Sequence, residues 1–131
     1  MIEMRKEYLQ KQYRGYIDCL NKQDWSRLGH YVADGVQRNG EVLGLAGYRE
    51  MLEGDFASIP DLSFEIDFIV SEPPYVAARL LFDCTPKGHL FGLPVNGKRV
   101  SFAENVFYRF ADEKIETVWS VIDQAAIEAQ L

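Results

Sequence analysis

The spacing of apolar residues changes near Pro60, and this change constrains the fold more than any other feature of the sequence. Before Pro60, apolar residues recur with the period of a helix, which predicts helices over 3–22, about 25–32 and 45–58. After it, apolar and polar residues approach alternation, which predicts strands over 62–70, 75–85, 99–110 and 114–123. Helices followed by a run of strands with short turns predict an α+β fold.

The segments between these elements carry turn signals. Gly35 is suited to end the second helix, and Asn39-Gly40 lies between β-compatible runs, which predicts a hairpin. Residues 86–97 are rich in Gly and Pro and are expected to form a loop. We expect three N-terminal helices to cover one face of a strongly curved antiparallel sheet, so that the resulting cone encloses an apolar pocket. The length of 131 residues indicates one domain over 1–131.

The charge and composition of the chain limit the kinds of molecule that it is expected to bind. The formal net charge of −6 argues against nucleic acid, whose phosphates attract basic surfaces, and against docking to anionic membranes. Apolar residues make up 47% of the chain, and the aromatic share of 13% is enough to fill a core and also to line a pocket for a flat or hydrophobic small molecule.

The cysteines and the N-terminus give no sign of secretion or metal binding. Cys19 and Cys84 are far apart and lack metal-ligand spacing, so reduced, buried thiols are expected, and no metal site is predicted. The N-terminal segment has no apolar stretch of a signal peptide, and no segment approaches the length of a membrane span. We therefore expect a cytoplasmic protein.

Two C-terminal stretches carry a family resemblance. GHLFGLPVNGKRVSF, residues 88–102, places a His shortly before a Gly, then a Pro, a Gly-Lys pair and a strand. YRFADEKIETVWSVID, residues 108–123, places an Arg-Phe strand end, a turn, Lys-Ile, a Trp and an Asp four residues later. With NKQDWSRLGHYVADGV and GLAGYREML nearer the N-terminus, the chain resembles the SnoaL-like polyketide cyclases of the nuclear transport factor 2-like fold over nearly its whole length.

The resemblance implies a cofactor-free enzyme that closes a polyketide ring by intramolecular aldol condensation. In that family an acidic residue on the last strand acts as the acid–base group, and Asp123 matches it by position. The characteristic His on the loop before the long third strand matches His89.

The residues themselves leave the role of Asp123 open. Strict alternation would place it on the same face as Ile115, Trp119 and Val121, and desolvation on such a face suits a carboxyl group to general acid–base catalysis. Alternatively, Asp123 caps the tail helix that starts at residue 124. The residues alone favour the cap, the resemblance favours catalysis, and both roles can coexist.

His89 has comparable alternatives. It could orient the carboxyl group, donate to a developing oxyanion or act as a second acid–base group. Equally, it could be a loop histidine that hydrogen-bonds the backbone.

Glu104 is an acid in the middle of a predicted strand, on the same face as aromatic and apolar residues. Such an acid requires a partner or a wet pocket. A buried pair with Arg79 on the neighbouring strand is slightly favoured, and the alternative is that Glu104 lines the pocket and helps to hold the substrate. The pocket-binding residues that we predict are Tyr16, Phe56, Phe102, Glu104 and Trp119.

The leading functional prediction is an enzyme that transfers protons on a small hydrophobic carbonyl substrate, with Asp123 as acid–base group and His89 assisting. The alternative is a non-catalytic module of the same fold that binds a hydrophobic small molecule or a partner subunit. We also expect a homodimer through the outer face of the sheet, because the resemblance implies one and because Ala103 and Phe107 alternate on the face of Arg109.

Overall fold

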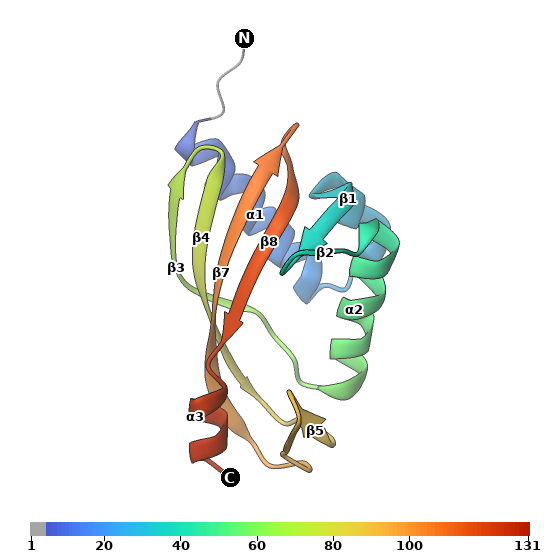
Figure 1. The fold of residues 1–131 in the computed structure, drawn as a ribbon, viewed down its shortest axis with the longest axis vertical. Helices are drawn as coiled ribbons and strands as arrows, with labels where there is room; N and C mark the ends of the chain where they lie inside the picture. Colours follow the sequence, from blue (N-terminus) through green and yellow to red (C-terminus); the bar gives the residue numbers. More distant parts are fainter. Residues whose placement is uncertain (1–4) are drawn as a thin grey trace.

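A curved six-stranded sheet forms the centre of the structure, a computed structural model that describes residues 5–131. The strands follow the order β2-β1-β8-β7-β4-β3 across the sheet (Figure 1). Their bounds are β1 (Val32–Arg38), β2 (Glu41–Val42), β3 (Glu65–Glu72), β4 (Tyr75–Cys84), β7 (Val100–Ala111) and β8 (Lys114–Ile122). Within the predicted loop, two short strands form a separate hairpin, β5 (His89–Leu90) with β6 (Leu93–Pro94).

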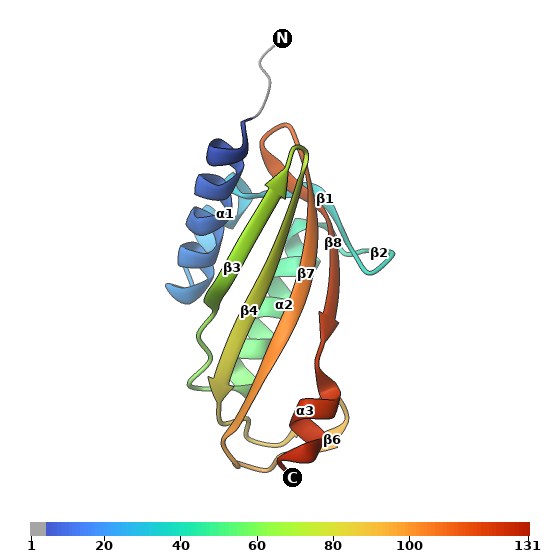
Figure 2. The same ribbon diagram turned by 90° about the vertical axis from the view of Figure 1, so that its left-hand side faces the viewer.

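Helices cover one face of this sheet. Helix α1 buries a stripe of apolar and aromatic side chains at helical spacing, which explains its position against the sheet. In Figure 2 the outer face of the sheet is toward the viewer and α2 lies behind it, which confirms the predicted α+β architecture. The helices are α1 (Lys6–Asn21), the 3₁₀ helix η1 (Trp25–His30), α2 (Gly44–Ser58) and the short α3 (Gln124–Ala129).

The segment after η1 differs from the prediction. The second helix is a short 3₁₀ turn, and the residues expected to end it, including Gly35, belong to β1 instead. Val32 and Ile115 explain the difference, because both are fully buried and pair across β1 and β8. This pairing is parallel, so the sheet is mixed rather than wholly antiparallel.

The hairpin between β1 and β2 is confirmed. Gln37 pairs with Val42 and Arg38 with Glu41, so Asn39 and Gly40 form the two-residue turn. Their φ angles are 49° and 83°, the left-handed conformations that this type of hairpin turn requires.

A β-bulge in β8 decides which side chains face the helices. Phe110 pairs with Ile115 and Arg109 with Thr117, so Glu116 is an extra residue without a cross-strand partner. Because side chains alternate between the two faces of a sheet, one extra residue moves every later side chain of the strand to the opposite face. Ile115 points inward as expected. Trp119 and Val121, which were expected on the same face, point outward instead.

A second bulge has the same effect in β3. Ile66 pairs with Leu80 and Phe68 with Arg79, which leaves Asp67 as the extra residue. Phe68 and Val70, which the alternation placed with Ile66, are therefore exposed on the outer face. No helix within residues 5–131 is long and apolar enough to cross a membrane.

Candidate active site

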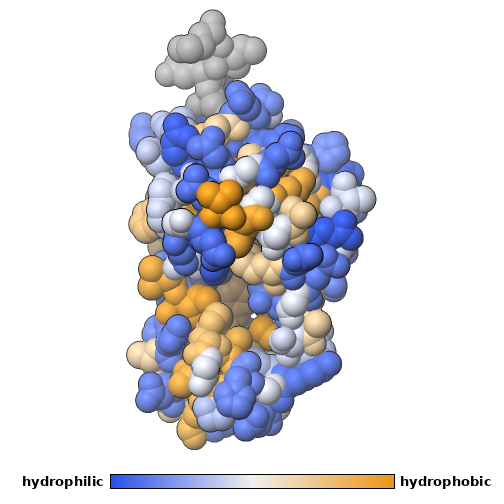
Figure 3. Space-filling model, turned by 45° about the vertical axis from the view of Figure 1, so that its right-hand side comes forward, coloured by the Kyte–Doolittle hydropathy of each residue, from blue (hydrophilic) through white to orange (hydrophobic). Residues whose placement is uncertain are grey.

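A pocket of about 180 Å³ lies between α2, the inner face of the sheet and the β5–β6 hairpin. Figure 3 shows the surface hollowed between the upper and lower parts of the molecule, with apolar residues around the depression. A smaller inner cavity of about 50 Å³ shares several lining residues with this pocket and extends it toward α1. The polar side chains common to both cavities are Arg38, Asp55 and Glu104.

The wall of the pocket is built largely from phenylalanine rings. Phe82 and Phe102 stack with centroids 5.1 Å apart and an interplanar angle of 22°. Phe64 packs edge-on against Phe82 at 5.2 Å, and Phe91 against Phe102 at 6.2 Å. Neighbouring inward positions on β4 and β7 place the stacked pair side by side, since Phe82 and Phe102 are cross-strand partners. A continuous aromatic surface of this kind favours a flat hydrophobic ligand.

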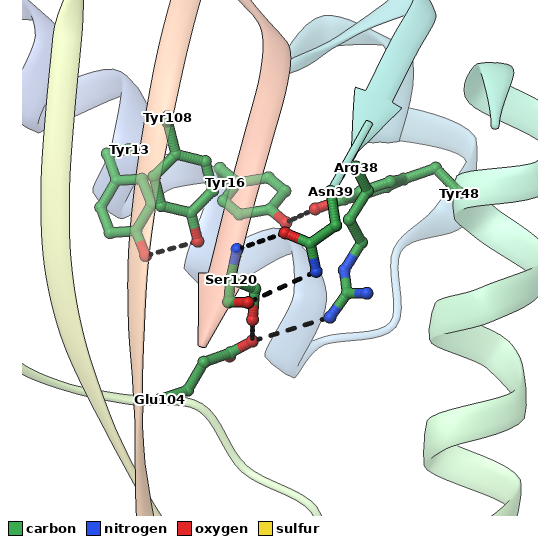
Figure 4. A network of polar contacts seen from close by, with 8 residues as sticks. All are labelled: Tyr13, Tyr16, Arg38, Asn39, Tyr48, Glu104, Tyr108 and Ser120. Atoms are coloured by element: carbon green, nitrogen blue, oxygen red, sulfur yellow. Dashed lines mark hydrogen bonds and ion pairs between the residues drawn. The ribbon is translucent and has the colours of Figure 1, made fainter. Parts of the chain in front are cut away.

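Glu104 projects from the inner face of β7 into the junction of the two cavities (Figure 4). The Ser120 hydroxyl donates a short hydrogen bond to its carboxylate, and an Arg38 guanidinium nitrogen lies 4.0 Å from the same oxygen. Only 13% of the Glu104 side chain is exposed. Burial raises the pKa of Glu104, while the Ser120 hydrogen bond and the Arg38 charge act in the opposite direction. A carboxyl group in this state suits proton transfer to and from a bound molecule.

Asn39 joins the groups on either side of Glu104. Its side-chain oxygen accepts from the Ser120 backbone N–H at 2.9 Å, and its side-chain nitrogen donates to the Ser120 carbonyl at 3.3 Å. The Asn39 backbone N–H also donates to the Val118 carbonyl at 2.9 Å. These bonds fix the β1–β2 hairpin to β8, so Arg38 and Ser120 are both held against Glu104 (Figure 4).

Asp55 brings a second carboxyl group to the pocket from α2. It lies in the inward stripe of that helix, three residues after Leu52 and four before Ile59, both of which are buried. Asp55 is exposed at the pocket mouth as a whole residue, yet partial burial of its carboxyl group raises its pKa from 3.8 to about 6. Arg38 lowers the pKa and Glu104 raises it, so the three groups act on one another.

Replacing Asp55 with Asn should remove a contribution to the free energy of unfolding that falls as pH rises toward about 6. The folded protein holds the Asp55 proton up to about pH 6, whereas the unfolded chain releases it near 3.8, so between these values the folded state binds more protons. The contribution of Asp55 to the free energy of unfolding therefore falls as pH rises through this window, by on the order of 1 kcal/mol once solvent screening is allowed for. Urea unfolding of both proteins from about pH 4 to 7 measures this.

The matched control is Glu50→Gln, which removes an exposed carboxyl group from the same helix. Glu50→Gln should follow the wild-type curve. Equal slopes in wild type and Asp55→Asn would show that the Asp55 carboxyl group is not desolvated.

Two pairs of tyrosine hydroxyls lie deeper than Glu104. The hydroxyls of Tyr16 and Tyr48 are 2.7 Å apart, and those of Tyr13 and Tyr108 are 3.0 Å apart. Burial raises the pKa of all four, that of Tyr48 to about 12. These phenols therefore stay protonated at neutral pH. Tyr16, Tyr48 and Tyr108 line the inner cavity, where phenol groups can donate and accept hydrogen bonds.

Three of the predicted pocket residues line a cavity. Phe102 and Glu104 line the main pocket, and Tyr16 lines the inner cavity. Phe56 lies behind the wall, with its ring 5.9 Å from Trp25 and 6.1 Å from Phe64. Trp119 lines neither cavity: it is 41% exposed on the outer face, opposite Phe107, because the bulge at Glu116 reversed its facing.

The predicted catalytic residues lie just outside the pocket lining. Asp123 is exposed and accepts a hydrogen bond from the Ala126 backbone N–H at 3.1 Å, which confirms the alternative of a helix cap. Its predecessor Ile122 faces the pocket instead. His89 is likewise exposed, while the adjacent Leu90 lines the pocket. Asp123 lacks the desolvated setting expected for it, and the catalytic roles of Asp123 and His89 stay predictions.

The predicted pair between Glu104 and Arg79 is wrong. Arg79 pairs with Asn105 across the strands, so it lies on the outer face, where Asp67 is 3.2 Å from its guanidinium. The partner of Glu104 is Arg38, which the sequence did not single out. Asp55 and Ser120 were missed as well, although an acid within the apolar stripe of a helix was a detectable signal for Asp55.

Comparisons with known proteins agree on one family. The model of the SnoaL-like polyketide cyclase family matches residues 10–131. A SnoaL-like polyketide cyclase from Agrobacterium tumefaciens is 53% identical, with a TM-score of 0.93 over 97% of this chain and 98% of that one. No curated protein matches the chain.

More distant structures share the fold. TsrD from Streptomyces laurentii is 22% identical, with a TM-score of 0.85 over 98% of this chain and 97% of its own. IdmH from Streptomyces antibioticus is 19% identical, with a TM-score of 0.80 over 93% of this chain and 96% of its own.

Proposed function

Because the chain belongs to the SnoaL-like polyketide cyclase family, we propose that it is an enzyme that transfers protons on a small hydrophobic carbonyl compound, with Glu104 as its acid–base group. The observation that carries this proposal is the position of Glu104. Its carboxyl group is desolvated, supported by Ser120 and Arg38, and directed into a pocket walled by phenylalanine rings.

The chemistry is of the aldol type and needs no cofactor. Glu104 removes a proton from the carbon next to a carbonyl group, and the electrons of the broken C–H bond form an enolate. The enolate carbon then bonds to a second carbonyl carbon of the same molecule, whose oxygen becomes an alkoxide and takes a proton from a carboxyl group. Glu104 and Asp55 both border the pocket and can supply that proton.

The size of the pocket favours a substrate with one or two rings inside it. An engineered cavity of about 150 Å³ in another protein binds benzene, and the pocket here measures about 180 Å³ before the inner cavity is added. The open mouth leaves room for a substituent to extend into solvent.

A non-catalytic binding module is the second candidate, and the position of Asp123 favours it. In a binding module, Asp123 would only cap helix α3 and face solvent, as it does here. The candidates differ in turnover, because a binding module would hold a ketone without exchanging its protons.

Deuterium exchange tests the choice between them. Proton NMR can follow the loss of α-protons from 2-indanone and 2-tetralone in D₂O with and without the protein. We expect the protein to accelerate exchange, and the rate to rise with pH as Glu104 loses its proton. Exchange at the buffer rate for both ketones across the pH range, despite binding, would support the non-catalytic module.

We also propose that the outer face of the sheet joins two copies of the chain. The face exposes large apolar side chains that a monomer would normally cover, namely Phe68, Val70, Phe107, Trp119 and Val121. Charges on the same face are paired within the chain, Arg79 with Asp67 and Arg109 with Glu116. A second copy of this face therefore meets apolar surface and internally balanced charge, a combination that suits a symmetric interface.

A further inference from the structure

We propose that Arg38 binds the oxygen anion that forms when Glu104 takes a proton, so that the pocket selects planar ring compounds carrying an enolate-like oxygen. This inference rests on the proposed role of Glu104. It adds a second residue in contact with the substrate and a chemical feature by which substrates are recognised.

Within the described part of the chain, the N–H donors of the Arg38 guanidinium make no side-chain hydrogen bond. Its contact with Glu104, at 4.0 Å, is longer than a hydrogen bond, and within residues 5–131 it makes no other ion pair or side-chain hydrogen bond. A guanidinium carries five N–H donors. Arg38 lines both the main pocket and the inner cavity, and 28% of its side chain is exposed. Its free donors can therefore meet a ligand in the pocket.

The backbone around Arg38 is fixed before any ligand arrives. Arg38 immediately precedes the Asn39-Gly40 turn and pairs with Glu41 in β2 and Val118 in β8. The side chain of Asn39 makes two hydrogen bonds to the backbone of Ser120, the residue whose hydroxyl contacts Glu104. The backbone that carries Arg38 is therefore fixed, and only its side chain has to turn toward a ligand.

Proton transfer moves the negative charge from one partner of Arg38 to another. Before the step, the carboxylate of Glu104 carries the charge that attracts Arg38. After it, the C–H bond is broken, Glu104 is neutral, and the electron pair has become an enolate whose oxygen carries the charge. Arg38 can then turn its unused donors to that oxygen, so the site's total charge is unchanged while the intermediate is stabilised.

The remaining groups around Arg38 set the polarity of this end of the pocket. Asp55 approaches from α2, Glu104 from β7, and the hydroxyl of Tyr48 lies in the inner cavity beside them. Arg38 is the only cationic side chain among the described residues that line these two cavities. The rest of the main pocket lining is largely aromatic and apolar, so a ring with one oxygen gains most when that oxygen points to Arg38.

Binding of 2-naphthol and naphthalene tests the inference without any turnover. 2-Naphthol carries an enol-like oxygen on a flat ring, and its ionised form imitates an enolate, whereas naphthalene lacks the oxygen. We expect wild type to bind 2-naphthol at least tenfold more tightly than naphthalene, measured by ligand fluorescence. Arg38→Met should reduce that preference to about twofold or less while changing the Kd for naphthalene little, and Arg38→Lys should keep part of the preference. Circular dichroism and thermal unfolding check that each variant is folded.

Three results would overturn the inference. Arg38→Met could keep the full preference, it could weaken both probes equally, or wild type could bind neither probe. Failure of the proposed function is separate, because it appears as α-proton exchange that does not depend on Glu104, whatever Arg38 does to binding.

Discussion

Replacing Glu104 with Gln should slow α-proton exchange of a bound ketone by at least about a hundredfold, since a positioned general base contributes about 10²–10⁴-fold. Gln has nearly the same shape and can still accept a hydrogen bond from Ser120, but it cannot take a proton. The free energy of unfolding should change little or rise, because the substitution removes a carboxyl group whose charged form is disfavoured by burial. Proton NMR of 2-tetralone in D₂O gives the rate, and urea unfolding gives the stability.

Asp123→Asn is the matched control for this variant. It also converts a carboxyl group to an amide, and Asn is as good a helix cap as Asp, so α3 should be retained. We expect Asp123→Asn to exchange protons at close to the wild-type rate. The reverse pattern, in which Asp123→Asn is inactive and Glu104→Gln is normal, would assign catalysis to Asp123 and reject Glu104.

Replacing Phe107 with Asp should weaken self-association by at least about a hundredfold. Phe107 lies near the middle of the outer face, it is 56% exposed, and it pairs with Trp119 on β8. Large aromatic residues at the centre of an interface often contribute 2 kcal/mol or more, and a symmetric dimer loses the contact on both sides. Sedimentation velocity from nanomolar to micromolar concentration measures the change.

Tyr8→Asp is the control for this substitution. Tyr8 is an exposed aromatic residue on α1, which covers the opposite face of the sheet, so its replacement should leave association unchanged. Wild type that sediments as a monomer at micromolar concentration would contradict the proposed dimer, as would a Phe107→Asp protein that associates like wild type.

The sequence predicted the fold well because periodicity and turn residues are local signals. Helices α1 and α2, the Asn39-Gly40 hairpin and the long strands β4, β7 and β8 all lie close to the predicted ranges. The parallel pairing of β1 with β8 was missed, because it depends on burial of Val32 against Ile115, more than 80 residues apart in the chain.

The prediction of which β8 side chains face the pocket was wrong for a similar reason. No residue type marks Glu116 as the extra residue of a bulge, and its position follows from how β8 pairs with β7. Counting alternate residues from Ile115 therefore directed Trp119 and Asp123 to the pocket, whereas Ser120 and Ile122 are the residues on its side.

The site was predictable where a single strand displayed the signal. Glu104 was recognised as an acid among aromatic residues of β7, and that environment holds whatever the neighbouring strand does. Arg38 and Asp55 come from a hairpin and a helix whose approach to β7 is a property of the whole fold. The position of Glu104 was therefore predictable from the sequence, and its contact with Arg38 was not.

A carbon-13 NMR titration of the Glu104 carboxyl group is the most direct measurement of whether this side chain is the desolvated acid–base group of the pocket. Uniformly labelled glutamate with Glu104→Gln as the assignment reference identifies the resonance. We expect its pKa to lie above the ordinary value of 4.5, because burial outweighs Ser120 and Arg38, and to rise further when 2-naphthol binds beside it. A pKa at or below 4.5 that does not respond to 2-naphthol would contradict the assignment of Glu104.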